Sequence, residues 1–367
     1  MPSPLRLILW ITLTSMALGA CFALFEYHPS GRAELIATAL HGAMIGGLTA
    51  GALSTTEFSV MRRGNGAYVR RLPFLLYFGL RSVFYLGVIL AIQYAINRLL
   101  PTTEGQVAAV TRVDIAFSLA LSLAFNLLIS VNDLLGPGVL FAFAAGRYHR
   151  PQVENRALLF IDMRGSTGIA ERLGEIRFLD FLNLFMADVS IAIAEAGGEI
   201  HKYVGDEVIA TWKLTPGKDA RVVEACFSAL DRLGANRAIY ERDFGERADF
   251  RAGLHAGPVV VGELGFFKKE IALIGDTMNT AARIEEACRE GDHRVLASGA
   301  LLAQLAGLPP GVASLAIGPL KLRGKERSVD VFAMEKRPRD LKLDRDPGRA
   351  RSAAPVSSFD AAEATKH

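Results

Sequence analysis

The chain has 367 residues, of which 51% are hydrophobic and 22% are charged, and its formal net charge at pH 7 is +3. So small a charge, without a basic block that carries interleaved aromatic residues, argues against a nucleic-acid partner. The three cysteines, Cys21, Cys226 and Cys288, lie far apart without CxxC or Cys/His spacing, which argues against a disulfide framework and a zinc site.

Residues 1–147 contain nearly all of the long apolar segments of the chain. The mean hydropathy of +0.27 is high for a chain with an ordinary charged fraction, so apolar and charged residues must be segregated. Four segments are apolar for about the 20 residues that a helix needs to cross a bilayer, namely 5–25, 35–53, 74–99 and 113–131. We therefore expect an N-terminal transmembrane bundle of four helices, residues 1–131, with the lipid bilayer as a partner.

Two polar residues inside these segments need partners within the bundle. Arg81 lies in the third segment and must either snorkel to the surface or face the bundle interior. His41 lies in the second segment and is a candidate haem ligand, but no other histidine lies inside a segment. A structural role for His41, hydrogen-bonded within the bundle, is therefore the favoured interpretation.

The distribution of arginines between the loops predicts the orientation of the bundle. Four arginines lie in the loop 54–73, and Arg147 and Arg150 follow the fourth segment, whereas each of the other two loops has one. Lys and Arg are retained on the cytoplasmic side of membrane proteins. We therefore expect a multi-pass protein of the inner cell membrane. Its chain is cytoplasmic from residue 132 onward, and residues 132–152 form a connector.

Two expected strand ends in the C-terminal half each carry an aspartate. The apolar run 157–161 predicts a buried strand that ends in Asp162, and the next residues predict a turn that opens a helix and cradles phosphate with its backbone N–H groups. Residues 199–203 and 208–212 predict a hairpin with Asp206 at its tip. Two aspartates on adjacent strand ends are able to hold two divalent cations. The oxygens of a polyphosphate substrate would complete the coordination of these cations.

Five sequence blocks carry a resemblance to a known family. They are FIDMRGST from Phe160, KYVGD from Lys202, RAGLHAG from Arg251, IGDTMNTAAR from Ile274 and LRGK from Leu322. Their order and spacing over residues 153–335 resemble the catalytic domain of the class III adenylate and guanylate cyclases, of the membrane-anchored bacterial type. The resemblance implies a ferredoxin-like α/β domain over residues 153–336 that dimerises head to tail, with active sites between the two copies.

The resemblance also implies roles for most of the candidate site. Asp162 and Asp206 would bind two Mg²⁺ or Mn²⁺ ions per active site, together with the backbone carbonyl of Met163. Asn279 and Arg283, one helical turn apart, would orient the ribose and stabilise charge on the reacting phosphoryl group. Without the family, Arg283 would be assigned to an ion pair with a nearby acid. The other substrate-binding positions are Gly165, Ser166 and Thr167 in the phosphate-binding turn, and Lys325, which matches a triphosphate-binding lysine.

Two positions of this family read the purine base. Lys202 occupies the first, and its ammonium donates to an acceptor such as adenine N1, whereas a guanine-selective site needs a carboxylate there. The second position is usually Asp or Thr and is Ala272 here, which cannot hydrogen-bond through its side chain. Lys202 therefore favours ATP, and Ala272 leaves the strength of selection against GTP open.

We therefore expect an adenylate cyclase, a phosphorus–oxygen lyase that converts ATP to 3′,5′-cyclic AMP and pyrophosphate at a homodimer interface and signals from the membrane. A guanylate cyclase and a catalytically inactive, nucleotide-sensing membrane receptor are the alternatives. A diguanylate cyclase is disfavoured because Val204 stands where its GGDEF turn needs the first glycine. Residues 337–367 contain few apolar residues, and a disordered tail is expected there.

Overall fold

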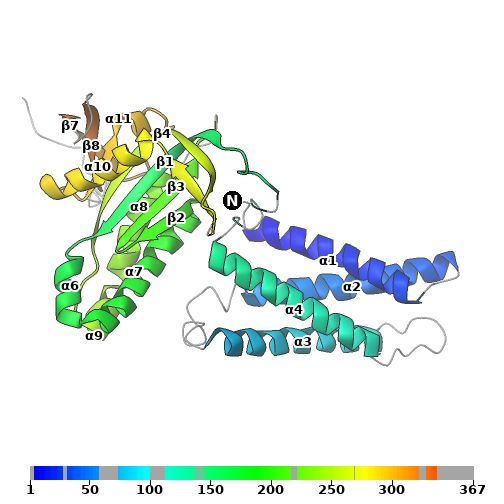
Figure 1. Cartoon of the computed structure of the whole chain (residues 1–367). Coiled ribbons are helices and arrows are strands. Elements are labelled where there is room, and N and C mark those ends of the chain that lie inside the picture. Colours follow the sequence, from blue (N-terminus) through cyan, green and yellow to red (C-terminus); the bar gives the residue numbers. More distant parts are fainter. Residues whose placement is uncertain are drawn as a thin grey trace, which may run out of the picture.

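The computed structural model contains an N-terminal helical bundle and a C-terminal α/β domain (Figure 1). The residues that the structure describes are 4–27, 31–57, 73–99, 112–136, 139, 143, 145–215, 221–267, 269–321 and 328–336. The arginine-rich part of the 54–73 loop and the tail 337–367 lie outside these residues, and so do the predictions made for them.

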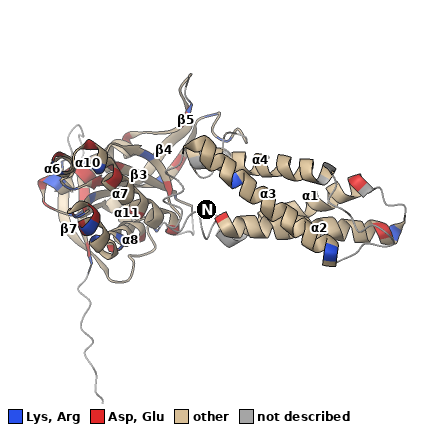
Figure 2. Cartoon of the chain, turned by 90° about the horizontal axis from the view of Figure 1, so that it is seen from below, with Lys and Arg blue, Asp and Glu red and all other residues tan. Residues whose placement is uncertain are grey.

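Four helices form the bundle, close to the four predicted segments. They are α1 (Pro4–Tyr27), α2 (Arg32–Thr56), α3 (Phe74–Leu99) and α4 (Arg112–Leu135). Away from their ends they carry few charged side chains, in contrast to the α/β domain (Figure 2). By length and composition, three of the described helices contain a candidate membrane span, at Ile8–Glu26, Arg32–Thr56 and Phe74–Leu99. Helix α4 contains a shorter apolar stretch, Ile115–Val131, so the fourth span stays a prediction.

Buried polar contacts join α2 to α3 inside the bundle. Arg81 is 2% exposed and its guanidinium lies 2.6 Å from Glu57, which follows α2, so this arginine faces the bundle interior. The hydroxyl of Tyr85 accepts a hydrogen bond from Arg81 at 2.8 Å and donates one to Glu57 at 2.7 Å. His41 Nε2 lies 2.7 Å from Asn97 Oδ1, a contact that agrees with the structural role favoured for this histidine.

The α/β domain is built on one mixed sheet with helices on both faces (Figure 1). The strands are β1 (Gln152–Met163), β2 (Glu199–Val204), β3 (Glu207–Lys213), β4 (Phe250–Leu264), β5 (Glu270–Ile274), β6 (Val295–Ser298), β7 (Val312–Leu320) and β8 (Val329–Lys336). The helices are α6 (Ser166–Leu173), α7 (Glu175–Glu195), α8 (Val222–Ala235), α9 (Arg237–Phe244), α10 (Asp276–Glu290) and α11 (Gly299–Leu302). The strand order is β2-β3-β1-β4-β6-β8-β7, with β5 paired to β4. Within it, β1-α7-β2-β3-α8-β4 has the β-α-β-β-α-β order of a ferredoxin-like unit.

Strand β1 lies at the centre of this domain and is buried on both faces. Residues 157–161 are each at most 4% exposed, as their uninterrupted apolar run predicts. Leu159 packs with α7 and α8 in the larger core, whereas Phe160 packs with α10 on the opposite face. Because side chains alternate between the faces of a strand, Asp162 lies on the same side as Phe160, toward α10.

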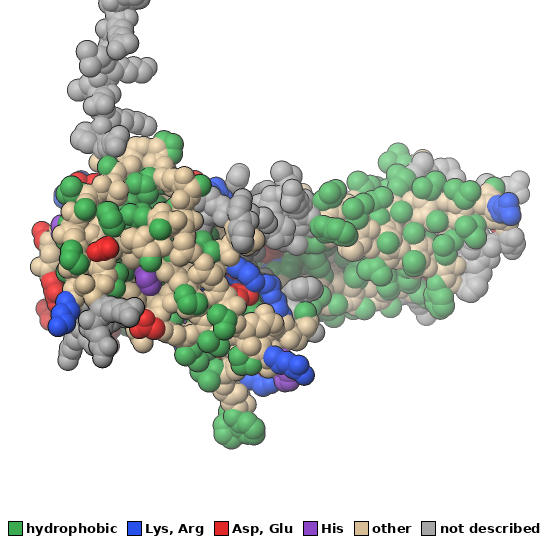
Figure 3. Space-filling model, turned by 90° about the horizontal axis from the view of Figure 1, so that it is seen from above, with side chains coloured by type: hydrophobic (Ala, Val, Ile, Leu, Met, Phe, Trp, Pro, Cys, Tyr) green, Lys and Arg blue, Asp and Glu red, His purple; other side chains and the backbone are tan. Residues whose placement is uncertain are grey.

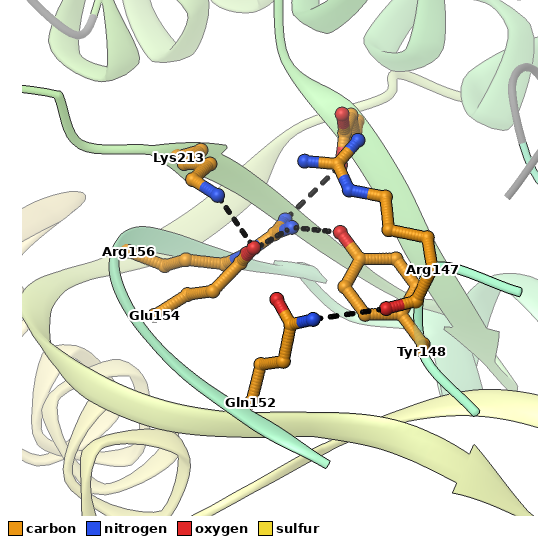
Figure 4. Close-up of polar contacts among 7 residues, drawn as sticks. Arg147, Tyr148, Gln152, Glu154, Arg156 and Lys213 are labelled. Atoms are coloured by element: carbon orange, nitrogen blue, oxygen red, sulfur yellow. Dashed lines mark hydrogen bonds and ion pairs between the residues drawn. The ribbon is translucent and has the colours of Figure 1, made fainter. Parts of the chain in front are cut away.

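A network of polar contacts joins the connector to the sheet (Figure 4). Arg156 is 4% exposed and donates to Glu154 at 2.9 Å and to Glu199, at the start of β2, at 3.0 Å. It also donates to the hydroxyl of Tyr148 in the connector at 3.3 Å, and Lys213 donates to Glu154 at 2.6 Å. Burial alone would raise the pKa of Glu154, but the hydrogen bonds from Lys213 and Arg156 outweigh burial and hold this pKa below its usual value.

Arg156→Met is expected to lower the free energy of unfolding by about 2 kcal/mol at neutral pH, because Glu154 loses a buried charged partner. Folding lowers the pKa of Glu154, so its pairing stabilises the domain fully above the unfolded value of 4.5. That contribution is lost as the pH falls through the lower folded value. Urea unfolding of residues 148–367 at neutral and acid pH measures both effects.

The matched control for this experiment is Lys213→Met, which removes a partner of Glu154 whose side chain is 46% exposed. It should cost less than about 1 kcal/mol, because water screens an ion pair with an exposed member. An equal loss in the two variants, or a loss in Arg156→Met that persists undiminished at acid pH, would contradict the importance of the buried pair.

Candidate active site

The two aspartates predicted at strand ends lie on neighbouring strands. Asp162 is the penultimate residue of β1, and its register partner across the β1–β3 ladder is Glu207. Asp206 directly precedes Glu207, in the two-residue turn between β2 and β3, where Gly205 has φ = 63°. A positive φ is typical of such tight hairpin turns and favours glycine. The hairpin therefore brings Asp206 next to the end of β1.

Negative charge is concentrated around Asp162. Burial raises the pKa of Asp162 and the charge of Asp206 raises it further, against the opposing effects of Arg289 and Arg251. Arg289 donates from Nη2 to Asp162 Oδ2 at 2.9 Å. Burial, followed by the charge of Asp162, also raises the pKa of Glu207 to about 7. Arg289 and Arg251 therefore compensate only part of the negative charge of these acidic side chains.

Glu285 on α10 is a further buried acid beside Asp162. Glu285 is 5% exposed, and its Oε1 atom has no hydrogen-bond partner. Burial, followed by the charge of Asp162, raises its pKa to about 7. A bound divalent cation would relieve the repulsion between these carboxylates. Carboxylate oxygens are also the ligands that Mg²⁺ and Mn²⁺ prefer, so the chemistry of the donor set fits these ions.

The side chains of this region do not form a complete metal site by themselves. Within the described residues, no three His, Cys, Asp or Glu side chains converge as a metal site requires. Further ligands for ions at Asp162 and Asp206 would therefore come from the backbone, the substrate or water. Met163 fits such a role only through its main chain, because its side chain is 2% exposed and packs in the hydrophobic core.

The turn after β1 leads into helix α6. Gly165 has φ = 68° and precedes Ser166, the first residue of the helix, and Thr167 follows. The N-cap residue, Gly165, has no side chain that could occupy the first N–H groups of the helix. The first backbone N–H groups of a helix have no partner within it, so this turn has the donors that an anion needs.

The candidate purine-reading positions lie on another part of the sheet. Lys202 lies on β2, and its Nζ is 3.1 Å from Glu270 Oε1 at the start of β5. Ala272 lies in the middle of β5, is 8% exposed and pairs with Gly262 of β4. The ion pair therefore places Lys202 beside the strand that carries Ala272.

Helix α10 carries Asn279 and Arg283 one turn apart. Asn279 is exposed, and Arg283 donates to Glu286 at 2.7 Å, the local ion pair expected without the family. Within the described residues, no hydrogen bond or ion pair joins Lys202, Asn279 or Arg283 to either aspartate. Lys325 lies outside the described residues. A single chain therefore holds the described candidate residues in separate groups.

Sequence reasoning missed several charged residues of these groups. The sequence could have identified Glu207 as a site residue, because it directly follows Asp206 in the hairpin turn. Glu285 and Arg289 have the i, i+4 spacing of one helix face, but only the packing of α10 on β1 shows that this face meets Asp162. Glu270 had no signal, because its contact with Lys202 depends on how the β4–β5 hairpin folds across the sheet.

Comparisons with known proteins assign the domain to a family. The family described as the adenylate and guanylate cyclase catalytic domain matches residues 148–335. Adenylate cyclase 2 of Rhizobium meliloti (strain 1021) is 34% identical over 221 residues, which are 60% of this chain and 61% of that protein. The adenylate cyclase of Anabaena cylindrica is 30% identical over 183 residues, 48% of this chain and 36% of that protein. The chain therefore spans less than two thirds of the length of each of these curated relatives.

A solved structure of a bacterial light-regulated adenylyl cyclase resembles the chain in fold. The match covers 63% of this chain and 68% of that chain, with a TM-score of 0.50 and 16% sequence identity. At this identity the likeness concerns the fold alone, and function must be argued from the site.

Glu285→Gln is expected to raise the free energy of unfolding by about 2 kcal/mol above neutral pH without metal, because the folded domain then no longer holds a buried carboxylate. Folding raises the pKa of Glu285 from 4.5 to about 7, so its contribution to stability falls as the pH rises across this interval. Urea unfolding of residues 148–367 with EDTA, below and above the interval, measures the difference.

The control for this prediction is Glu290→Gln, an exposed acid on the same helix. It should change stability by less than about 0.5 kcal/mol at either pH. A gain from Glu285→Gln that is the same at both pH values would show that ionisation of this residue is not its cause.

Proposed function

Because this chain belongs to the family of adenylate and guanylate cyclase catalytic domains, we propose that it converts ATP to 3′,5′-cyclic AMP and pyrophosphate. The adenylate cyclases among its relatives support this activity. The observation that carries it is the cluster of carboxylates around Asp162 and Asp206, in which Glu285 is buried and the others are half-buried. Such a cluster suits a metal-dependent reaction of a polyphosphate. The candidate membrane spans support a location at the cell's inner membrane, with the catalytic domain in the cytoplasm.

Asp162 and Asp206 would hold two Mg²⁺ or Mn²⁺ ions, with the backbone carbonyl of Met163 as a further ligand. When bound, the ions would supply positive charge against the triphosphate and acidity at the ribose 3′-hydroxyl. Arg289 lies on Asp162 in the free chain and shields part of its charge. In the free chain the cationic partner of Asp162 is therefore Arg289, and in the loaded site it would be a metal ion.

The remaining residues would position the nucleotide. The backbone N–H groups of Gly165, Ser166 and Thr167 would donate to phosphate oxygens, as the start of α6 allows. Lys325 would add a cation to the triphosphate. Asn279 would orient the ribose, and Arg283 would exchange its exposed ion pair for the charge that develops on the reacting phosphoryl group. In-line attack of the 3′-hydroxyl on the α-phosphorus then forms the cyclic ester and expels pyrophosphate.

Adenine selection would rest on Lys202. Its ammonium has hydrogens to donate to adenine N1, and its ion pair with Glu270 gives it a defined position beside β5. Ala272 has no polar side-chain atom and contributes no base-specific hydrogen bond. Guanylate cyclase activity is the second candidate, since one lysine alone decides between the bases.

We place the complete site between two copies of the chain. Asp162 and Asp206 would come from one copy, and Lys202, Asn279 and Arg283 from the other, because a single chain holds them in separate groups. Asn279 is exposed and Arg283 makes only a local ion pair, so both have the access that a second copy requires. A two-fold axis would generate two equivalent sites.

The proposed activity predicts that residues 148–367 with Mn²⁺ form cyclic AMP from ATP at least about tenfold faster than cyclic GMP from GTP, because Lys202 donates to adenine N1. Measurement of both products by chromatography tests the assignment. Asp206→Asn should remove at least about 99% of the activity, because it takes away a charged metal ligand. Faster turnover of GTP would favour the guanylate cyclase, and absence of both products from the wild type would favour the inactive receptor.

The shared site predicts complementation between two inactive variants. In a mixed dimer of Asp206→Ala and Arg283→Ala chains, one site collects both lesions and the other has none, because the dimer is symmetric. Co-expression should therefore restore up to about half of the wild-type rate per mixed dimer, measured after purification through two different affinity tags. Mixed dimers without activity would place all of these residues in one chain's site.

A further inference from the structure

The carboxylate on which metal binding would depend is already paired with an arginine. Helix α10 reaches the end of the α/β domain away from the bundle, where acidic and basic side chains gather on the surface (Figures 1 and 3). Arg289 lies in the last turn of this helix, and its Nη2 donates to Asp162 Oδ2 at 2.9 Å. The guanidinium takes up one oxygen of the carboxylate and repels a second cation. The contact therefore opposes the binding of a divalent cation at Asp162.

The ion pair between Arg289 and Asp162 is one that a cation is able to break. The side chain of Arg289 is 64% exposed, whereas that of Asp162 is 16% exposed. Water screens an ion pair with an exposed member, so the pair contributes little stability. Arg251, whose charge also acts on Asp162, lies within β4 opposite this acid, and its side chain is only 16% exposed. Arg289 is therefore the more easily displaced of the two arginines.

Glu285 gives Arg289 a second possible partner. It lies four residues before Arg289 on α10, the spacing at which a glutamate and a later basic residue meet on one helix face. Glu285 is 5% exposed, and its Oε1 atom has no hydrogen-bond partner. A buried carboxylate oxygen without a donor is unfavourable, so Arg289 would make a favourable hydrogen bond there on leaving Asp162.

We propose that Arg289 competes with divalent cations for Asp162: it holds this acid in the free chain and moves to Glu285 when a cation binds. The inference rests on the metal-dependent function proposed above, but it concerns the binding of the ion and not the reaction. The exchange leaves neither acid without a cationic partner. It also raises the cation concentration at which the domain binds metal, so Arg289 limits activity at low metal concentration.

The test measures the binding of Mn²⁺ alone to the full-length chain in detergent micelles. Electron paramagnetic resonance reports the free ion, so the dissociation constant is obtained without turnover. In Arg289→Gln this constant should fall about fivefold, because the ion no longer displaces a guanidinium from Asp162. An equal constant in the wild type and the variant would overturn the proposal and leave the metal assignment standing, whereas Mn²⁺ that binds to neither protein would overturn both.

The matched control is Arg294→Gln, which removes the same charge from the same domain. Arg294 donates to Asp249 at 3.0 Å and its side chain is 53% exposed, but neither residue belongs to the candidate site. The change in the dissociation constant should stay below about 1.5-fold. A gain in affinity equal to that of Arg289→Gln would show a general effect of net charge and would overturn the competition at Asp162.

Glu285→Gln tests the movement of Arg289, because a neutral side chain attracts a guanidinium less strongly. In this background Arg289 keeps to Asp162, so the gain in affinity from Arg289→Gln should rise from about fivefold to at least about tenfold. The wild type, the two single variants and the double variant form a cycle that removes the independent effect of the charge of Glu285. The same gain in both backgrounds would overturn the movement to Glu285.

Discussion

Electrostatic repulsion at the end of β1 is the constraint on which the rest of the candidate site depends. Strand β1 is buried on both faces, so the backbone of Asp162 has a fixed position, and the hairpin turn holds Asp206 beside it. Burial and neighbouring charges raise the pKa of Asp162, and those of Glu207 and Glu285 to about 7. The folded domain thus holds acids together that a divalent cation would stabilise and that Arg289 neutralises only in part.

A second constraint is the separation of the functional groups within one chain. The carboxylates gather where β1, the β2–β3 turn and α10 meet, whereas Lys202 is held by Glu270 beside β5. Arg283 makes a local ion pair with Glu286 and, among the contacts of the described residues, no hydrogen bond or ion pair with either aspartate. In the proposed dimer, folding of one chain would align parts of two half-sites, and a symmetric second copy would complete both.

Hydrogen bonds attach the connector to the sheet that carries the candidate site. Arg156 bonds Tyr148 in the connector and Glu199 at the start of β2, and β2 carries Lys202 and leads into the Asp206 turn. A path of hydrogen bonds, part of which Figure 4 shows, thus links the connector to the start of β2, and the chain of β2 continues it to the candidate site residues.

The sequence by itself determined the elements and the chemistry of their ends. The apolar segments predict the bundle helices, the run 157–161 predicts the central strand, and the turn residues predict the hairpin that carries Asp206, because these signals depend on neighbours in the chain. Only the tertiary structure decided which charges meet. The contacts of Asp162 with Arg289 and of Lys202 with Glu270 join residues far apart in sequence, and burial, which sets the pKa values, exists only after packing.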